Sequence, residues 1–139
     1  MTYCNGTQKD KLILSADNLH IIKWYVDSAF GVHPDFKSHT SAVMAYRGGA
    51  AQSISSNQKL NTRSSTEAEH VSTNDVSIMI LWTKLFMKAQ GFKIDSNILY
   101  QDNKSTMLLL NNGKYSSSQH TQAFNIPHFF LTDQIKKII

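Results

Sequence analysis

The sequence is short of cysteine and of long apolar runs, and each shortage excludes a class of protein. Its single cysteine, Cys4, excludes an internal disulfide, indicates a reducing compartment and gives no cysteine–histidine spacing of a zinc site. No apolar run reaches the roughly 18 residues that span a bilayer, and the N-terminus shows no basic-then-apolar leader. We therefore expect an intracellular protein without a membrane segment.

The composition that remains is that of one globular domain. The chain has 139 residues, of which 41% are hydrophobic and 17% charged, so it has enough apolar side chains to form a core. The net charge is +4 and the isoelectric point is near 9.2. This mild basic excess permits contact with phosphates but does not establish it.

The first half of the chain has the composition of β-strands. Ile21–Asp27 is rich in β-branched and aromatic residues and predicts a first strand. After a loop, Ser41–Arg47 predicts a second strand, and Gly48–Gly49 predicts a hairpin turn into a third strand over Ala50–Ser56.

The second half changes to helical spacing. From Ser64 onward, apolar residues recur every three or four positions until Gly91, which predicts a long amphipathic helix. The stripe consists of Ala68, Val71, Ile78, Met79, Trp82, Leu85, Phe86 and Ala89. A strand over Asn97–Asp102, a short helix closed by Gly113, a polar connector and a C-terminal helix follow. This order predicts an α/β fold: a mixed sheet with flanking helices.

Three acidic residues fall where the predicted elements begin or end. Asp27 closes the first strand, Asp102 closes the fourth, and Glu69 lies in the first two turns of the long helix. Carboxylates that converged there would repel one another unless a cation such as Mg²⁺, which prefers oxygen ligands, neutralised them. Turns and helix starts also favour acidic residues for local reasons, so spacing alone leaves both interpretations open.

The two glutamates of the long helix are expected to have different roles. Ser64 and Glu67 match a capping box, and Thr66 with Glu69 is a second, shifted match. Residues two apart on a helix point about 200° from each other, so at most one of the glutamates faces a shared crevice.

Four blocks then resemble a known family: "YVDSAFGVHPDFKSHTSAVM", "QKLNTRSSTEAEHV", "ILWTKLFMKAQGF" and "ILYQDNKSTMLLL". They are similar to successive blocks of the ribonuclease H domain in the Pol polyprotein of copia-type LTR retrotransposons. The resemblance runs from about Leu12 to Ile135, and "YCNGT" resembles the end of the preceding reverse transcriptase connection. It implies a connection tail over residues 1–18 and a ribonuclease H-like domain over residues 19–139.

The resemblance implies hydrolysis of the RNA strand of RNA–DNA hybrids during reverse transcription. Asp27, Glu69 and Asp102 take the places of the family's catalytic and metal-binding acids, which bind two Mg²⁺ ions. The implied partners are the hybrid and the rest of the Pol polyprotein, with no membrane and no small-molecule cofactor. The implied location is the cytoplasm, in a virus-like particle.

The chain also departs from the family pattern. The family fold is a mixed sheet with an antiparallel three-strand meander and a parallel strand, and its fourth carboxylate lies on a final helix after a fifth strand. The chain stops at Ile139, so we expect the last strand and last helix to be missing and a sheet edge to be uncovered. The connector "SSSQHTQAFNIPHFF" lacks basic residues, and Pro127 replaces an expected arginine. We therefore expect weak or no activity, and a non-catalytic nucleic-acid-binding or degraded remnant stays the alternative.

The remaining candidates are basic, histidine and aromatic residues. Phosphate contacts, or equally well solvated surface charges, are expected at Lys59, Arg63, Lys104 and Lys114. Scattered spacing indicates ordinary core or surface residues rather than a zinc site at His33, His39, His70, His120 and His128, with His120 the candidate proton carrier. Periodicity favours core packing over base stacking at Trp24, Tyr25, Trp82 and Phe86.

Overall fold

The structure is a computed structural model that describes residues 5–11 and 20–112. The predicted connector, the C-terminal helix and Lys114 lie outside the described residues. The elements are β1 (Ile21–Ala29), β2 (His39–Tyr46), β3 (Gly49–Asn57), α2 (Ser65–Ala89), β4 (Ser96–Tyr100) and α3 (Lys104–Asn112). None of the helices in these ranges has both the length and the apolar character needed to cross a bilayer.

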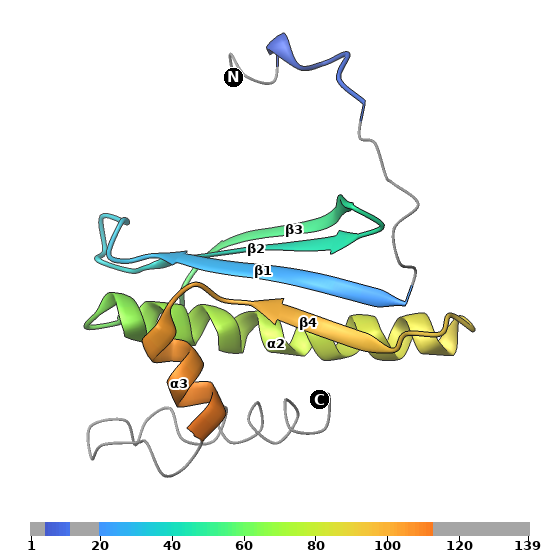
Figure 1. Cartoon of the computed structure of the whole chain (residues 1–139). Coiled ribbons are helices and arrows are strands. Elements are labelled where there is room, and N and C mark those ends of the chain that lie inside the picture. The colour runs from blue at the N-terminus through green and yellow to red at the C-terminus, as the bar shows by residue number, and fades with distance from the viewer. Residues whose placement is uncertain (1–4, 12–19, 113–139) are drawn as a thin grey trace.

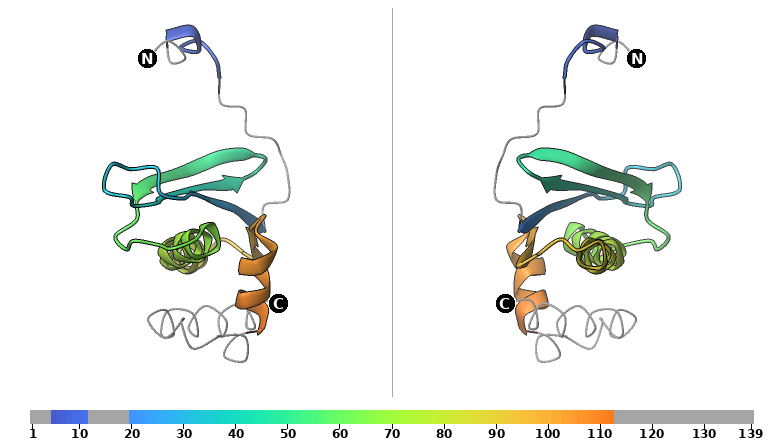
Figure 2. Two further views of the ribbon diagram at one scale, coloured as in Figure 1. Left: turned by 90° about the vertical axis from the view of Figure 1, so that its left-hand side faces the viewer. Right: turned by 90° about the vertical axis from the view of Figure 1, so that its right-hand side faces the viewer.

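The four strands form one mixed sheet in the order β3-β2-β1-β4. β1, β2 and β3 pair antiparallel as a meander, and β4 pairs parallel with β1 after the chain has crossed over through α2. Figures 1 and 2 show α2 against one face of this sheet, with α3 beside it near β4. The predicted α/β, ribonuclease H-like mixed sheet is confirmed.

The two strand ends next to the acidic residues differ from their predicted positions. β1 continues past Asp27 to Ala29, because Asp27 pairs with Ser41 and Ala29 with His39 of β2. β4 ends at Tyr100, so Asp102 lies two residues beyond the strand rather than at its end. There the chain turns into α3, where Asn103 Oδ1 accepts a hydrogen bond from the backbone N–H of Thr106 at 3.1 Å.

The hairpin turn between β2 and β3 lies one residue earlier than predicted. Tyr46 pairs with Gly49, and the two turn residues are Arg47 and Gly48 with φ of 57° and 74°. Positive φ at both central residues is the type I′ geometry that matches strand twist. Gly48 adopts it freely, whereas Arg47 is held there by the pairing on either side.

The core lies between the sheet and α2. Strand alternation turns Ile22, Trp24 and Val26 toward the helix, and Trp24 is completely buried. Val76 and Ile80 contribute the central part of the helix face. This packing fixes which end of α2 lies under the ends of β1 and β4.

The buried face of α2 differs from the predicted stripe. It follows Glu69, Thr73, Val76, Ile80 and Thr83, at the expected three- and four-residue spacing but with more polar side chains than predicted. Burial of the two threonines is tolerated because their hydroxyls donate to the carbonyls of Glu69 (2.9 Å) and Met79 (2.7 Å), each four residues earlier.

The predicted core role of the later stripe residues is therefore wrong. Ile78, Trp82, Leu85 and Phe86 lie on the outer side of α2, with exposed fractions of 69%, 54%, 67% and 45%. The rings of Trp82 and Phe86 stack on each other at 4.9 Å instead of entering the core. Apolar periodicity alone cannot say which of two neighbouring helix faces meets the sheet.

Candidate metal centre

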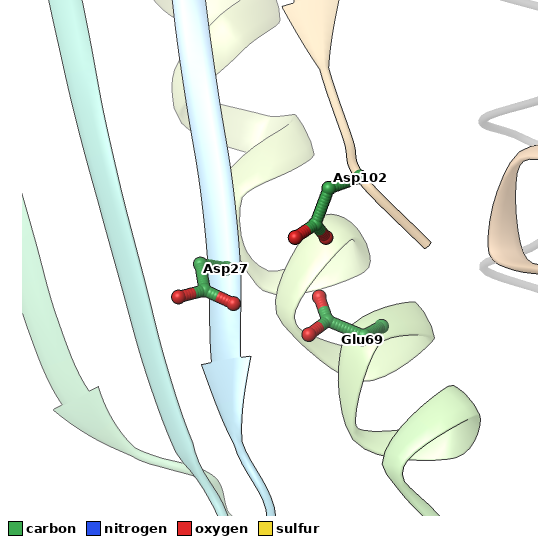
Figure 3. Close-up of side chains that lie close together, drawn as sticks. All are labelled: Asp27, Glu69 and Asp102. Atoms are coloured by element: carbon green, nitrogen blue, oxygen red, sulfur yellow. The ribbon is translucent and has the colours of Figure 1, made fainter. Parts of the chain in front are cut away.

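Three carboxylates from separate elements come together at one end of the sheet. Asp27 lies on β1, Glu69 on the second turn of α2 and Asp102 just after β4, and Figure 3 shows them pointing toward one another. One oxygen of each lies within 4.8 Å of the others. These are the three acids that the sequence singled out.

The sheet register and one long-range hydrogen bond explain this placement. Tyr25 pairs with Tyr100 in the parallel β1–β4 ladder, so Asp27 and Asp102, each two residues later, reach the same level. The buried side chain of Gln58 donates to the carbonyl of Ala68 at 2.8 Å and holds the neighbouring turn of α2 near the end of β3. Glu69 is thereby held under the carboxyl ends of the strands.

A single backbone N–H links two of the carboxylates. The N–H of Ser28 donates to Asp27 Oδ1 at 2.8 Å and to Glu69 Oε1 at 3.2 Å. The two acids are therefore oriented by the backbone of β1 itself. Asp27 and Asp102 are exposed while Glu69 is 6% exposed, so the group has one anchored, buried carboxylate and two that solvent can reach.

Gln101 orients the other oxygen of Glu69, and the sequence reasoning missed it. Its Nε2 donates to Glu69 Oε2 at 3.1 Å and to Thr73 Oγ1 at 3.2 Å, while its Oε1 accepts from the N–H of Asn103 at 3.1 Å. The signal was available, because alternation along β4 places residue 101 on the side opposite Tyr100, toward α2.

The electrostatics of the group favour a bound cation. Burial raises the pKa of the Glu69 carboxyl, hydrogen bonds from Ser28 and Gln101 lower it, and the charge of Asp27 raises it further, with a net rise. The ionised Glu69 is thus less favourable in the fold than in water unless positive charge lies beside it.

The donor set fits Mg²⁺. All three ligand groups are carboxylates, and in residues 5–11 and 20–112 no histidine or cysteine joins the group. Oxygen ligands suit Mg²⁺ rather than the softer transition metals. The Ser28 hydroxyl, next to Asp27, is buried without a hydrogen-bond partner, so the site also holds a polar atom that water or a ligand could satisfy.

A hollow of about 470 Å³ opens on the exposed side of the group. Its lining includes Asp27, Ser41, Val43 and Asp102, together with Tyr25 and Tyr100. The two tyrosine rings stack at 4.8 Å and are 46% and 43% exposed. The predicted core position of Tyr25 is wrong, because alternation along β1 places it opposite the buried Trp24.

The other glutamate of the helix start is separated from this group. Ser64 is the N-cap and its Oγ accepts from the N–H of Glu67 at 3.1 Å, as the capping box predicts. The Glu67 carboxylate accepts from the N–H of Arg63 at 2.7 Å, one residue before the usual partner. The shifted match of Thr66 with Glu69 is not used, since Glu69 Oε1 and Oε2 bond to Ser28 and Gln101.

Three of the four predicted phosphate contacts lie in the described ranges, and all three are on the surface. Lys59 and Arg63 are exposed in the connection between β3 and α2, and Lys104 is the exposed first residue of α3. Partial burial raises the pKa of Asp75 on α2, and the charge of Lys59 lowers it, so Lys59 lies near this helix. Their role at phosphates stays a prediction.

The structure pairs two histidines that the sequence left scattered. His33 and His39 meet, with ring nitrogens 2.9 Å apart, while His70 is buried in α2. His120 and His128 lie outside the described residues. The sequence could not predict this contact, because it depends on how the β1–β2 loop folds back.

Comparison with known proteins adds one relative. No protein-family model matches the chain. It is 26% identical over 136 residues to the "Retrovirus-related Pol polyprotein from transposon TNT 1-94" of Nicotiana tabacum. The alignment covers 97% of this chain and 10% of the tobacco protein, so the chain spans about a tenth of that relative. Over nearly its whole length, the chain is therefore similar to one short region of a retrotransposon Pol polyprotein.

Proposed function

We propose that this chain is a ribonuclease H domain of a retrotransposon Pol polyprotein and hydrolyses the RNA strand of RNA–DNA hybrids. The observation that carries the proposal is the convergence of Asp27, Glu69 and Asp102 from β1, α2 and the end of β4. The ribonuclease H-like sheet and the similarity to a Pol polyprotein support it.

The three carboxylates divide between two tasks in this proposal. Glu69 is the fixed ligand, because Ser28 and Gln101 hold both of its oxygens. Asp27 and Asp102 are the accessible ligands, because they are exposed and line the open hollow through which a phosphodiester would arrive. Bound Mg²⁺ would neutralise the charge of the carboxylates and phosphate and would activate a water molecule for an in-line displacement at phosphorus.

Exposed basic residues outside the carboxylate group would bind the negatively charged backbone of the substrate. The exposed Lys59, Arg63 and Lys104 are the proposed contacts to the hybrid backbone, together with Lys114. No fourth carboxylate joins the three within the described ranges, so we expect slow hydrolysis. As part of a Pol polyprotein, the domain would act beside reverse transcriptase, in a cytoplasmic virus-like particle.

A cleavage assay tests the proposal. The purified chain is incubated with an RNA–DNA hybrid labelled on the RNA strand, with and without Mg²⁺, and compared with Asp27→Asn. The matched control is Asp95→Asn, which removes an exposed aspartate at the opposite end of β4. We expect slow Mg²⁺-dependent cleavage that Asp27→Asn abolishes and Asp95→Asn preserves.

Two outcomes would contradict the proposal. Cleavage that persists in Asp27→Asn would show that the carboxylate group is not responsible. Salt-dependent binding of the hybrid without any cleavage would instead support the alternative of a non-catalytic nucleic-acid-binding module.

A further inference from the structure

A second group of potential ligands lies where the β1–β2 loop folds back on the sheet. His33, in that loop, brings its Nε2 to 2.9 Å from Nδ1 of His39, the first residue of β2. Asn57 pairs with His39 across β2 and β3 and places its Oδ1 3.2 Å from the same Nδ1. Two potential metal-binding atoms, one from the loop and one from β3, thus lie within 3.2 Å of the His39 Nδ1.

The protons available at His39 Nδ1 cannot give both of its contacts a hydrogen bond at once. The Nδ1 of His39 carries at most one proton; of its two neighbours, the amide oxygen of Asn57 can only accept, and Nε2 of His33 donates or accepts according to its tautomer. If Nδ1 is protonated, one hydrogen is shared between two acceptors. If Nδ1 is not protonated, its lone pair faces the oxygen of Asn57. A cation in place of the shared proton would satisfy all three atoms.

The distances match those between ligands of one metal ion. Zinc binds nitrogen and oxygen ligands at about 2.0–2.1 Å, so two ligands 90–110° apart lie about 2.9–3.4 Å from each other. The observed separations of 2.9 Å and 3.2 Å fall in this range.

The far side of the His39 ring has the partner that a metal-binding histidine needs. Its Nε2 lies 2.8 Å from Ser55 Oγ, so an Nε2–H donated to this hydroxyl leaves Nδ1 bare and turned to the site. Both histidines are half-buried and Asn57 is exposed, which leaves room for water at further coordination positions. Imidazole donors favour zinc, nickel or copper over magnesium.

We propose that His33, His39 and Asn57 form a binding site for a borderline divalent transition-metal ion, separate from the carboxylate group. An ion there would cross-link the β1–β2 loop to β2 and β3. The loop already closes on itself through the bond from Phe36 N–H to His33 O at 2.9 Å, so His33 is presented in a defined geometry.

Zinc titration of the full chain tests the site. Binding is followed by isothermal calorimetry and by the histidine ring resonances in NMR spectra, for the wild type and for His33→Gln and His39→Gln. The matched control is His20→Gln, which removes an exposed histidine just before β1. We expect the His33 and His39 variants to lose zinc affinity by at least about tenfold and the His20 variant to keep it.

Two further arms keep the proposal open to refutation. Asp27→Asn should leave zinc affinity unchanged, because the carboxylate group is not involved; loss in that variant would place the zinc there and overturn the proposal. Equal zinc affinity in the wild type and in a folded His33→Gln, His39→Gln double variant would overturn it as well. Circular dichroism spectra of each variant serve as the control for correct folding.

Discussion

Replacement of Glu69 by glutamine separates the function of this carboxylate from its effect on stability. The change removes one negative charge and almost preserves the shape of the side chain. Glu69 is nearly buried, and its oxygens lie among those of Asp27 and Asp102 within 4.8 Å. We therefore expect the variant to be slightly more stable than the wild type without metal at neutral pH, and to bind Mg²⁺ much more weakly.

The magnitude follows from two opposing effects. Two unit charges 4.8 Å apart repel by about 3.5 kcal/mol at an effective dielectric constant of 20 and by about 0.9 kcal/mol in water. Because Asp27 and Asp102 are exposed, the lower end applies, which gives relief of about 2 kcal/mol for both pairs. Against this, a single amide oxygen cannot accept from both Ser28 and Gln101, and losing one such bond costs about 1.5 kcal/mol. The net gain is at most about 1 kcal/mol.

The pH dependence is the more decisive measurement. The folded pKa of Glu69 lies above its ordinary value of 4.5, so the folded wild type takes up a proton more readily than the unfolded chain. The wild type therefore gains stability as pH falls through the folded pKa, and that stability is fully present below the unfolded pKa. The glutamine variant lacks this gain, so its advantage near pH 7.5 should vanish near pH 4.

Urea denaturation in EDTA at these two pH values, followed by calorimetric Mg²⁺ titration, provides the assay. The matched control is Glu67→Gln, which should loosen the helix start and leave Mg²⁺ affinity unchanged, because Glu67 bonds to Arg63 outside the site. A Glu69→Gln variant that is less stable than the wild type by the same amount at both pH values would refute the electrostatic reasoning. Equal Mg²⁺ affinities of the two variants would refute the division of roles between the glutamates.

Three other changes test neighbouring features. Gln101→Leu should weaken Mg²⁺ binding about tenfold, because Glu69 Oε2 loses its orienting donor, and calorimetry showing unchanged affinity would contradict this role. Ser64→Ala should lower the free energy of unfolding by about 1 kcal/mol through loss of the N-cap, whereas Ser65→Ala, one residue inside the helix, should not. Arg47→Asn should raise the free energy of unfolding by about 1 kcal/mol, because asparagine tolerates positive φ, and urea denaturation measures this change. A loss of stability would show that the Arg47 side chain matters more than its backbone.

The sequence by itself determined what depends on near neighbours in the chain. The period-two strands, the helical spacing from Ser64 to Gly91 and the Ser64 cap arise from local sterics and hydrogen bonds, so residue types at short spacing were enough to predict them. The resemblance to a family motif selected Asp27, Glu69 and Asp102. Helix geometry had already shown that Glu67 and Glu69 could not share one site.

Only the tertiary structure decided what depends on contacts between distant segments. Which face of α2 is buried was settled by packing against β1, and this left Trp82 and Phe86 exposed although their spacing fits a core. The hold of Gln101 on Glu69 requires the β1–β4 register, and the meeting of His33 with His39 requires the loop to fold back. Such contacts join residues whose positions are fixed by the sheet as a whole, so a local pattern can give the side on which Gln101 lies but not the residue that it contacts.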